Sequence, residues 1–158
     1  MASSDTGAAA APSAAGLALF AYDGSALAKL AIEQAGRQLA PGREALVVCV
    51  WQPGDVGFVA PERHLNAAEA TEVRRAAEET AAHGALLAEK AGFRPQSLAI
   101  QAAPTWKGIV EVAEAREASL IVLGSHRRTG LVEHLLGSVA AGVMAHWASS
   151  VLVVHGRP

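Results

Sequence analysis

The chain has 158 residues, of which 51% are hydrophobic and 4% aromatic, and its formal net charge is −2. This length can bury a sizeable core, and the lack of a basic excess argues against a nucleic-acid-binding protein. No apolar run approaches the roughly 20 residues that cross a membrane, and the six histidines show no zinc-ligand spacing.

The start of the chain differs in composition from the rest, because the first fifteen residues are rich in Ala, Ser and Pro. They lack the basic start and continuous apolar core of a secretory signal, so we expect residues 1–15 to be a disordered tail. Residues 16–156 are expected to form one domain. The one cysteine, Cys49, lies in an apolar run that suits a buried position, and this usage fits the reducing cytoplasm.

Strand patterns and helix patterns alternate after the tail. Strands are expected at Gly16–Tyr22, Ala45–Trp51, Ser97–Gln101, Ser119–Gly124 and Ser150–His155. Helices are expected at Leu27–Leu39, Asn66–Ala91, Lys107–Glu117 and Ser138–Trp147. The alternation predicts an α/β fold, with a five-stranded parallel sheet, right-handed crossovers and helices on both faces.

Two loops carry the residues that best suit ligand chemistry. Asp23–Ser25 follows the first expected strand, and Gly124–Gly130 follows the fourth. With the strand order 3-2-1-4-5 these strands are neighbours, and their carboxyl ends border the topological switch point where such sheets bind ligands. The second loop leads to a helix that begins near Gly137, so it offers backbone N–H groups and a helix N-terminus to a phosphate.

The loop after the fourth strand resembles the nucleotide loop of the universal stress protein family, whose pattern is Gly-2x-Gly-9x-Gly-Ser/Thr. Gly124, Gly137 and Ser138 match this pattern in register, and Arg127 stands where the family has its middle glycine. Further segments occur in the order of the family; they are Asp23–Ser25, Ala45–Trp51, Pro104, Leu120–Ser125, Gly137–Ala140 and Val151–Val154. The resemblance covers residues 17 to 154 and implies an adenine nucleotide alpha hydrolase-like fold.

The resemblance also implies a ligand and the residues that hold it. The ligand would be ATP or ADP, with Mg²⁺ as an accompanying ion. Backbone around Ala21 and Tyr22, together with Val50, would line the adenine slot, and Asp23 would face the ribose or a phosphate-bound metal. The phosphates would be surrounded by Gly124, Arg127, Gly137, Ser138 and Val139.

Most of these residues also have a purely structural explanation. Asp23 and Ser25 could simply cap the first helix, and Gly137 could belong to a turn that caps the helix after it. Gly124 could be required by a tight turn at the strand end. Arg127 leaves two outcomes open, because its side chain could obstruct the phosphate loop or supply a guanidinium group to the phosphates.

Motifs of common nucleotide enzymes are absent, since the sequence has no Walker A pattern and no G-x-G-x-x-G. The expected function is that of a nucleotide-dependent regulator in a stress response. Two alternatives stay open: a dimer that binds no nucleotide and acts through protein contacts, and a slow ATPase. The last strand, Val151–Val154, lies at a sheet edge in the assumed order, so we expect a homodimer paired through it.

Overall fold

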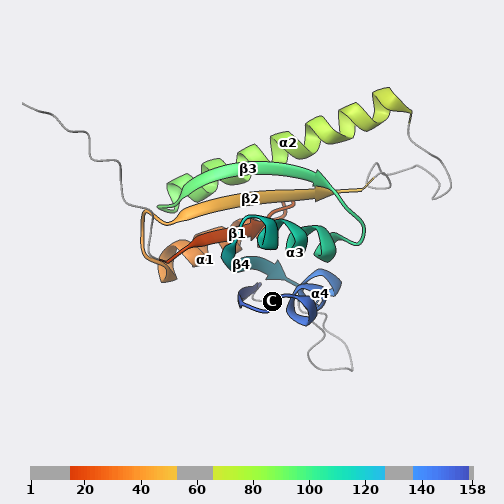
Figure 1. The fold of residues 1–158 in the computed structure, drawn as a ribbon. Helices are drawn as coiled ribbons and strands as arrows, with labels where there is room; N and C mark the ends of the chain where they lie inside the picture. Colours follow the sequence, from red (N-terminus) through yellow and green to blue (C-terminus); the bar gives the residue numbers. More distant parts are fainter. Residues whose placement is uncertain (1–14, 53–65, 127–136, 157–158) are drawn as a thin grey trace, which may run out of the picture.

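The computed structural model describes residues 15–52, 66–126 and 137–156, which form a parallel sheet flanked by helices (Figure 1). The strands are β1 (Leu17–Ala21), β2 (Glu44–Trp51), β3 (Arg94–Gln101), β4 (Ala118–Ser125) and β5 (Ser150–His155). The helices are α1 (Ala26–Gln38), α2 (Ala67–Lys90), α3 (Thr105–Ala115) and α4 (Ser138–His146). The order is β3-β2-β1-β4-β5 with every neighbouring pair parallel, which confirms the predicted fold class and strand order.

The helices cover the two faces of the sheet in pairs. Helices α1 and α2 pack on one face, where Phe20 and Val47 are buried, and the ring of Phe20 meets that of Phe93 edge to face at 5.1 Å. Helices α3 and α4 pack on the other face, against Leu19 and Val48. Because both faces are covered, the central strands are apolar at nearly every position. This packing fixes the carboxyl ends of β1 and β4 side by side.

Most element boundaries differ from the prediction by one to three residues. β3 begins at Arg94, earlier than expected, and includes Pro95, which pairs in register with Ala45 of β2. Proline is tolerated there because β3 is an edge strand, where its missing N–H group costs no ladder bond. α3 begins earlier, at Thr105, and β4 continues through Ser125 instead of ending one residue before it.

A buried arginine fastens the amino ends of the central strands. Arg43 is 8% exposed, and its Nε donates to the carbonyl oxygen of Gly16 at 2.9 Å. Its Nη2 donates to Ser119 Oγ at 2.9 Å, and that hydroxyl donates to the carbonyl of Ala15 at 2.8 Å. Burial lowers the pKa of Arg43, but a guanidinium stays charged in proteins. These hydrogen bonds hold together the amino ends of β1 and β4, at the opposite edge of the sheet from their carboxyl ends.

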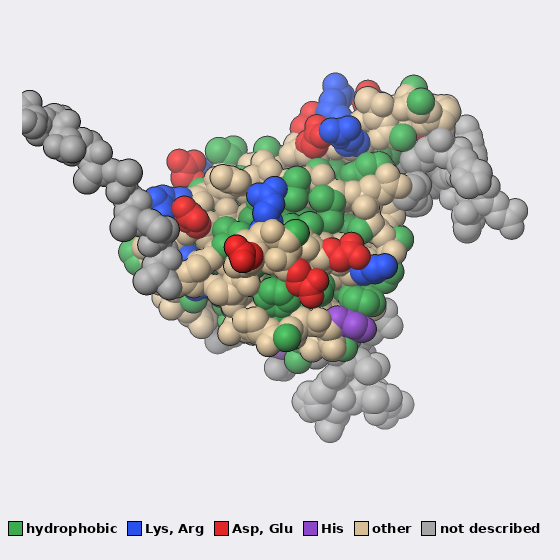
Figure 2. Space-filling model, in the orientation of Figure 1, with side chains coloured by type: hydrophobic (Ala, Val, Ile, Leu, Met, Phe, Trp, Pro, Cys, Tyr) green, Lys and Arg blue, Asp and Glu red, His purple; other side chains and the backbone are tan. Residues whose placement is uncertain are grey.

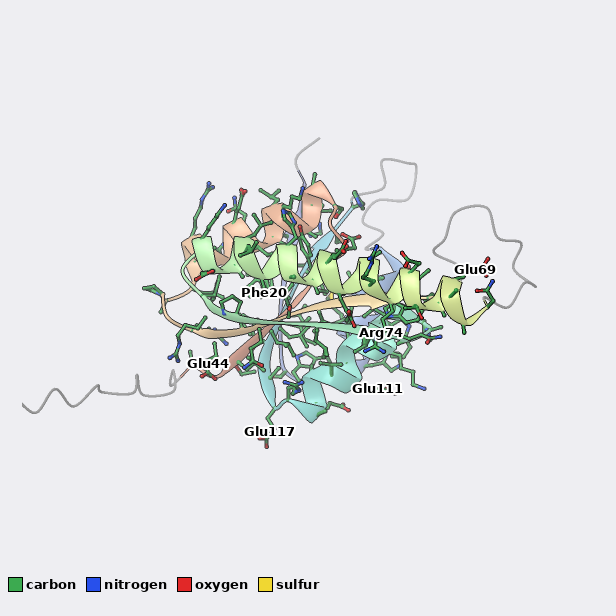
Figure 3. The ribbon with its side chains drawn as sticks, turned by 90° about the horizontal axis from the view of Figure 1, so that it is seen from above. Phe20, Glu44, Glu69, Arg74, Glu111 and Glu117 are labelled. Atoms are coloured by element: carbon green, nitrogen blue, oxygen red, sulfur yellow. The ribbon has the colours of Figure 1, made fainter. Side chains whose placement is uncertain are left out.

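Apart from the buried Arg43, the charged side chains of the described residues lie at the surface, as Figure 2 shows for one face. Asn66 and Glu69 form a capping box at the start of α2, and Arg74 pairs with Glu78 one turn apart at 2.9 Å. Figure 3 shows Phe20 beneath α2 and Glu69 at the far end of that helix, and the side chain of Arg74 is 69% exposed. Such exposed pairs add little stability and keep the helix surface solvated. No helix within the described ranges is long and apolar enough to cross a membrane.

Candidate functional site

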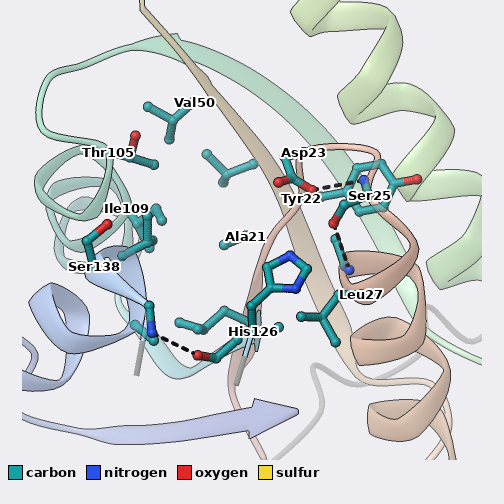
Figure 4. Close-up of a pocket in the computed structure, with 18 residues that line it drawn as sticks. Ala21, Tyr22, Asp23, Ser25, Leu27, Val50, Thr105, Ile109, His126 and Ser138 are labelled. Carbon is teal, nitrogen blue, oxygen red and sulfur yellow. Dashed lines mark hydrogen bonds between the residues drawn. The ribbon is translucent and has the colours of Figure 1, made fainter. Parts of the chain in front are cut away.

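A cavity of about 310 Å³ opens at the switch point, between the loop after β1, the end of β4 and the first turns of α3 and α4 (Figure 4). Its size falls at the lower end of the range for small-molecule sites. Its lining residues are Ala21, Tyr22, Asp23, Ser25, Leu27, Ala28, Val48, Val50, Thr105, Ile109, Leu123, Gly124, Ser125, His126, Gly137, Ser138, Val139 and Ala140.

The cavity brings together the candidate residues that the structure describes. They come from four separate parts of the chain and are Ala21, Tyr22, Asp23, Val50, Gly124, Gly137, Ser138 and Val139. Arg127, the remaining candidate, lies outside the described residues, as do the residues that follow it up to position 136. The strand order explains the convergence, because β1 and β4 are adjacent and β2 lies on the other side of β1.

The loop after β1 is held by its own side chains. Asp23 Oδ1 accepts the backbone N–H of Ser25 at 2.9 Å, and Ser25 Oγ accepts the N–H of Ala28 at 3.1 Å. Gly24, between them, has φ of +82°, a conformation that glycine adopts at little cost. Ser25 is therefore the N-cap of α1, as the structural explanation expects. Asp23 orders the turn and still lines the cavity.

Tyr22 contributes to the site mainly through its backbone. Its ring packs on α2, where a Cβ added to Gly84 would lie 2.6 Å from the ring. Its hydroxyl contacts His83 Nδ1 at 2.8 Å, and Figure 4 shows the ring leading toward α2. Burial, followed by the negative charge of Asp23, raises the pKa of Tyr22 above its usual value. The ring of Tyr22 is therefore directed toward α2, and the residue still lines the cavity.

Gly124 is a glycine because a helix lies against it. A Cβ at this position would lie 2.7 Å from Leu27 Cγ and 2.9 Å from the Leu27 carbonyl oxygen. The residue sits inside β4 and not in a turn, so the tight-turn explanation is wrong. Packing of α1 against β4 already requires the glycine, whatever ligand the cavity takes. This close packing also sets the position of the α1 N-terminus at the cavity wall.

The N-terminus of α4 borders the cavity without a side-chain cap. Gly137 is the N-cap residue, with φ of −54°, and it forms no side-chain hydrogen bond to the first turn. Its own N–H donates to Ser125 Oγ at 3.1 Å, which ties the start of α4 to the end of β4. Ser138 and Val139, the next two residues, also line the cavity. An uncapped helix N-terminus carries partial positive charge and is suited to an anion.

Sequence reasoning missed two polar residues of this wall. Ser125 is 3% exposed and follows Gly124 directly, so the loop pattern itself could have indicated it. Thr105 comes from the first turn of α3 and carried no sequence signal. The described lining contains one carboxylate, Asp23, and one imidazole, His126, and it holds no lysine or arginine. Attraction of an anion by the described residues therefore depends on the α4 N-terminus.

Comparison with known proteins identifies the family. A model described as the Universal stress protein family matches residues 18–155. The chain belongs to this family. Universal stress protein MJ0577 of Methanocaldococcus jannaschii is 38% identical over 66 residues, which cover 42% of this chain and 40% of that protein. Universal stress protein MJ0531 of the same organism is 41% identical over 68 residues, which cover 43% of this chain and 39% of that protein.

Solved structures share the fold of this universal stress protein over nearly its whole length. The structure of MJ0577 superposes with a TM-score of 0.70 at 24% identity, covering 91% of this chain and 98% of that chain. A universal stress protein in complex with cAMP gives a TM-score of 0.62 at 22% identity, covering 90% and 98%. The Archaeoglobus fulgidus protein in complex with dAMP gives 0.60 at 20% identity, covering 87% and 95%.

Proposed function

We propose that this universal stress protein binds an adenine nucleotide in the switch-point cavity and acts as a nucleotide-dependent regulator in a stress response. The observation that carries the proposal is the uncapped N-terminus of α4, which borders the same cavity as a set of apolar side chains. A nucleotide needs both features, because its base is largely apolar and its phosphates are anions. Helix N-termini bind phosphate through backbone N–H groups.

The two features come from different elements of the cavity wall. Val50 and Ile109 form apolar wall near Thr105, and Ala21 lies at the centre of the view in Figure 4. Ser138 and Gly137 bring the α4 N-terminus to the wall. A nucleotide would place its base against the apolar wall and its phosphates at the start of α4. The complexes of two structurally similar proteins with cAMP and dAMP support the choice of an adenine nucleotide.

The proposed ligand is ATP or ADP, with Mg²⁺ carried by the phosphates. Asp23 is the one carboxylate in the described lining, and no cluster of three or more metal-binding side chains occurs among the described residues. This arrangement fits Mg²⁺, which commonly binds one or two carboxylates, water and substrate phosphates. Asp23 would then hold the ion from the β1 side, and Mg²⁺ would neutralise phosphate charge.

A homodimer paired through Val151–Val154 belongs to the same proposal. β5 is an edge strand in the observed sheet, and the side chains of Val151 and Val153 are half-buried. Met144 of the neighbouring helix is 50% exposed. A second copy would cover this edge through a two-fold contact. Sedimentation velocity at tens of micromolar protein would show a dimer, and a monomer at that concentration would contradict the pairing.

Isothermal titration of nucleotide-stripped protein with ATP and ADP, with and without Mg²⁺, tests the ligand. Saturable binding is expected, and Asp23→Ala should reduce the increase in nucleotide affinity that Mg²⁺ causes. No binding of either nucleotide would favour the alternative of a dimer that acts through protein contacts alone. A steady-state rate of phosphate release from ATP that is higher for the unmodified protein than for Asp23→Ala would favour the alternative of a slow ATPase. Arg127→Gly should strengthen binding if the arginine obstructs the loop and weaken it if the arginine contacts phosphate.

A further inference from the structure

A side-chain pair at the apolar end of the cavity is not accounted for by the fold or by phosphate binding. Thr105 lies in the first turn of α3, lines the cavity and is half-buried. Its Oγ1 accepts a hydrogen bond of 3.0 Å from Nε2 of Gln52, the residue that follows β2. Figure 4 shows Thr105 next to Val50, on the far side of the cavity from His126.

The hydrogen bond fixes what Thr105 can offer to a ligand. A threonine hydroxyl has a single hydrogen and two acceptor lone pairs, and an amide nitrogen can only donate. Because Oγ1 accepts from Gln52, its own hydrogen is left to donate to an acceptor in the cavity. The apolar side chains of Val50 and Ile109 beside it offer no competing acceptor. The wall therefore presents a hydroxyl donor next to the apolar side chains of Val50 and Ile109.

We propose that Thr105 reads the base of the bound nucleotide by donating its hydroxyl hydrogen to one ring nitrogen of the purine. Gln52 is the positioning residue, since it turns the hydroxyl hydrogen toward the cavity. The inference rests on the proposed function, because it needs the base at the apolar end and the phosphates at α4. It adds a contact that determines specificity. A ligand with C–H in place of that ring nitrogen cannot accept the hydrogen bond from Thr105 and should bind more weakly.

The test combines a change in the protein with a change in the ligand. Thr105→Val keeps the shape of the side chain and removes the hydroxyl, and Thr105→Ser keeps the hydroxyl. Each protein is titrated with AMP and with its 1-deaza, 3-deaza and 7-deaza analogues, each of which replaces one ring nitrogen by C–H. Thermal melting of each variant without ligand reports whether the fold is kept.

One deaza analogue should bind the unmodified protein about 2- to 12-fold more weakly than AMP, the range expected for one neutral hydrogen bond. Thr105→Val should bind AMP and that analogue equally, and Thr105→Ser should restore the difference. Gln52→Glu should resemble Thr105→Val, because a carboxylate accepts and draws the hydroxyl hydrogen away from the cavity.

Two results would overturn the inference while leaving the proposed function in place. In the first, Thr105→Val binds AMP as tightly as the unmodified protein does. In the second, it weakens AMP and all three analogues by the same factor, which indicates a role in shape or in phosphate binding. Failure of the unmodified protein to bind AMP, ADP or ATP would overturn the proposed function and this contact with it.

Discussion

Replacement of Gly137 by aspartate should separate nucleotide binding from stability. Gly137 is the N-cap of α4, its φ of −54° is open to any residue, and an added Cβ would lie 3.7 Å from its nearest neighbour, Ser125 Oγ. Aspartate is a better N-cap than glycine, so Gly137→Asp should be at least as stable as the unmodified protein. Its carboxylate would, however, lie where the proposed phosphates bind.

The expected loss of affinity follows from the added charge. A carboxylate about 5 Å from a phosphate charge costs about 3 kcal/mol at an effective dielectric constant of about 20. This free energy corresponds to a loss of affinity of roughly two orders of magnitude. The loss should shrink at higher ionic strength, because the cavity is open and its charges are screened.

Gly137→Asn is the matched control, because asparagine has the size and capping ability of aspartate without its charge. Titration calorimetry of both variants with ADP, and urea denaturation of both, give the two quantities that are needed. We expect Gly137→Asn to bind ADP within a few-fold of the unmodified protein. Equal affinities of the aspartate and asparagine variants for ADP would refute the placement of phosphate at the start of α4.

Further predictions concern the scaffold of the site. Gly124→Ala should lower the free energy of unfolding by about 1–3 kcal/mol, because its Cβ would meet the Leu27 backbone; an unchanged urea midpoint would contradict this. Tyr22→Phe should lower it by about 1 kcal/mol at pH 7 through loss of the contact with His83. Because the pKa of Tyr22 is raised in the folded state, its contribution to stability is present below about pH 10 and is lost as the pH rises through the folded-state pKa. The free energy of unfolding from denaturation experiments should therefore decline above about pH 10, and this decline should be smaller in Tyr22→Phe. Arg43→Met should cost about 2 kcal/mol and lower the melting temperature, since its hydrogen bonds tie β1 to β4; a melting temperature equal to that of the unmodified protein would argue against this clamp.

The sequence by itself determined the class of fold and indicated the edge of the sheet at which the cavity lies. Strands and helices have different hydrophobic periods, so the alternation of these elements could be predicted without knowledge of tertiary contacts. The polar residues around Asp23 and the glycines of the second loop follow two apolar strands. Once those strands are neighbours, both loops must meet at the same edge of the sheet. Local sequence also gave Asp23 and Ser25 as possible caps of the first helix, and the structure shows Ser25 in that role.

Only the tertiary structure decided what the individual residues do there. Gly124 is required by Leu27, which belongs to another element, so no pattern around Gly124 could reveal the reason. Tyr22 turns toward α2 because a glycine of that helix leaves room for the ring. Thr105 reaches the cavity because α3 packs across β2, and Gln52 meets it from a position 53 residues earlier in the chain. Such contacts join segments that are far apart in the chain and that the crossovers bring together. A local sequence pattern depends on residues near one another in the chain, so it cannot reveal these contacts.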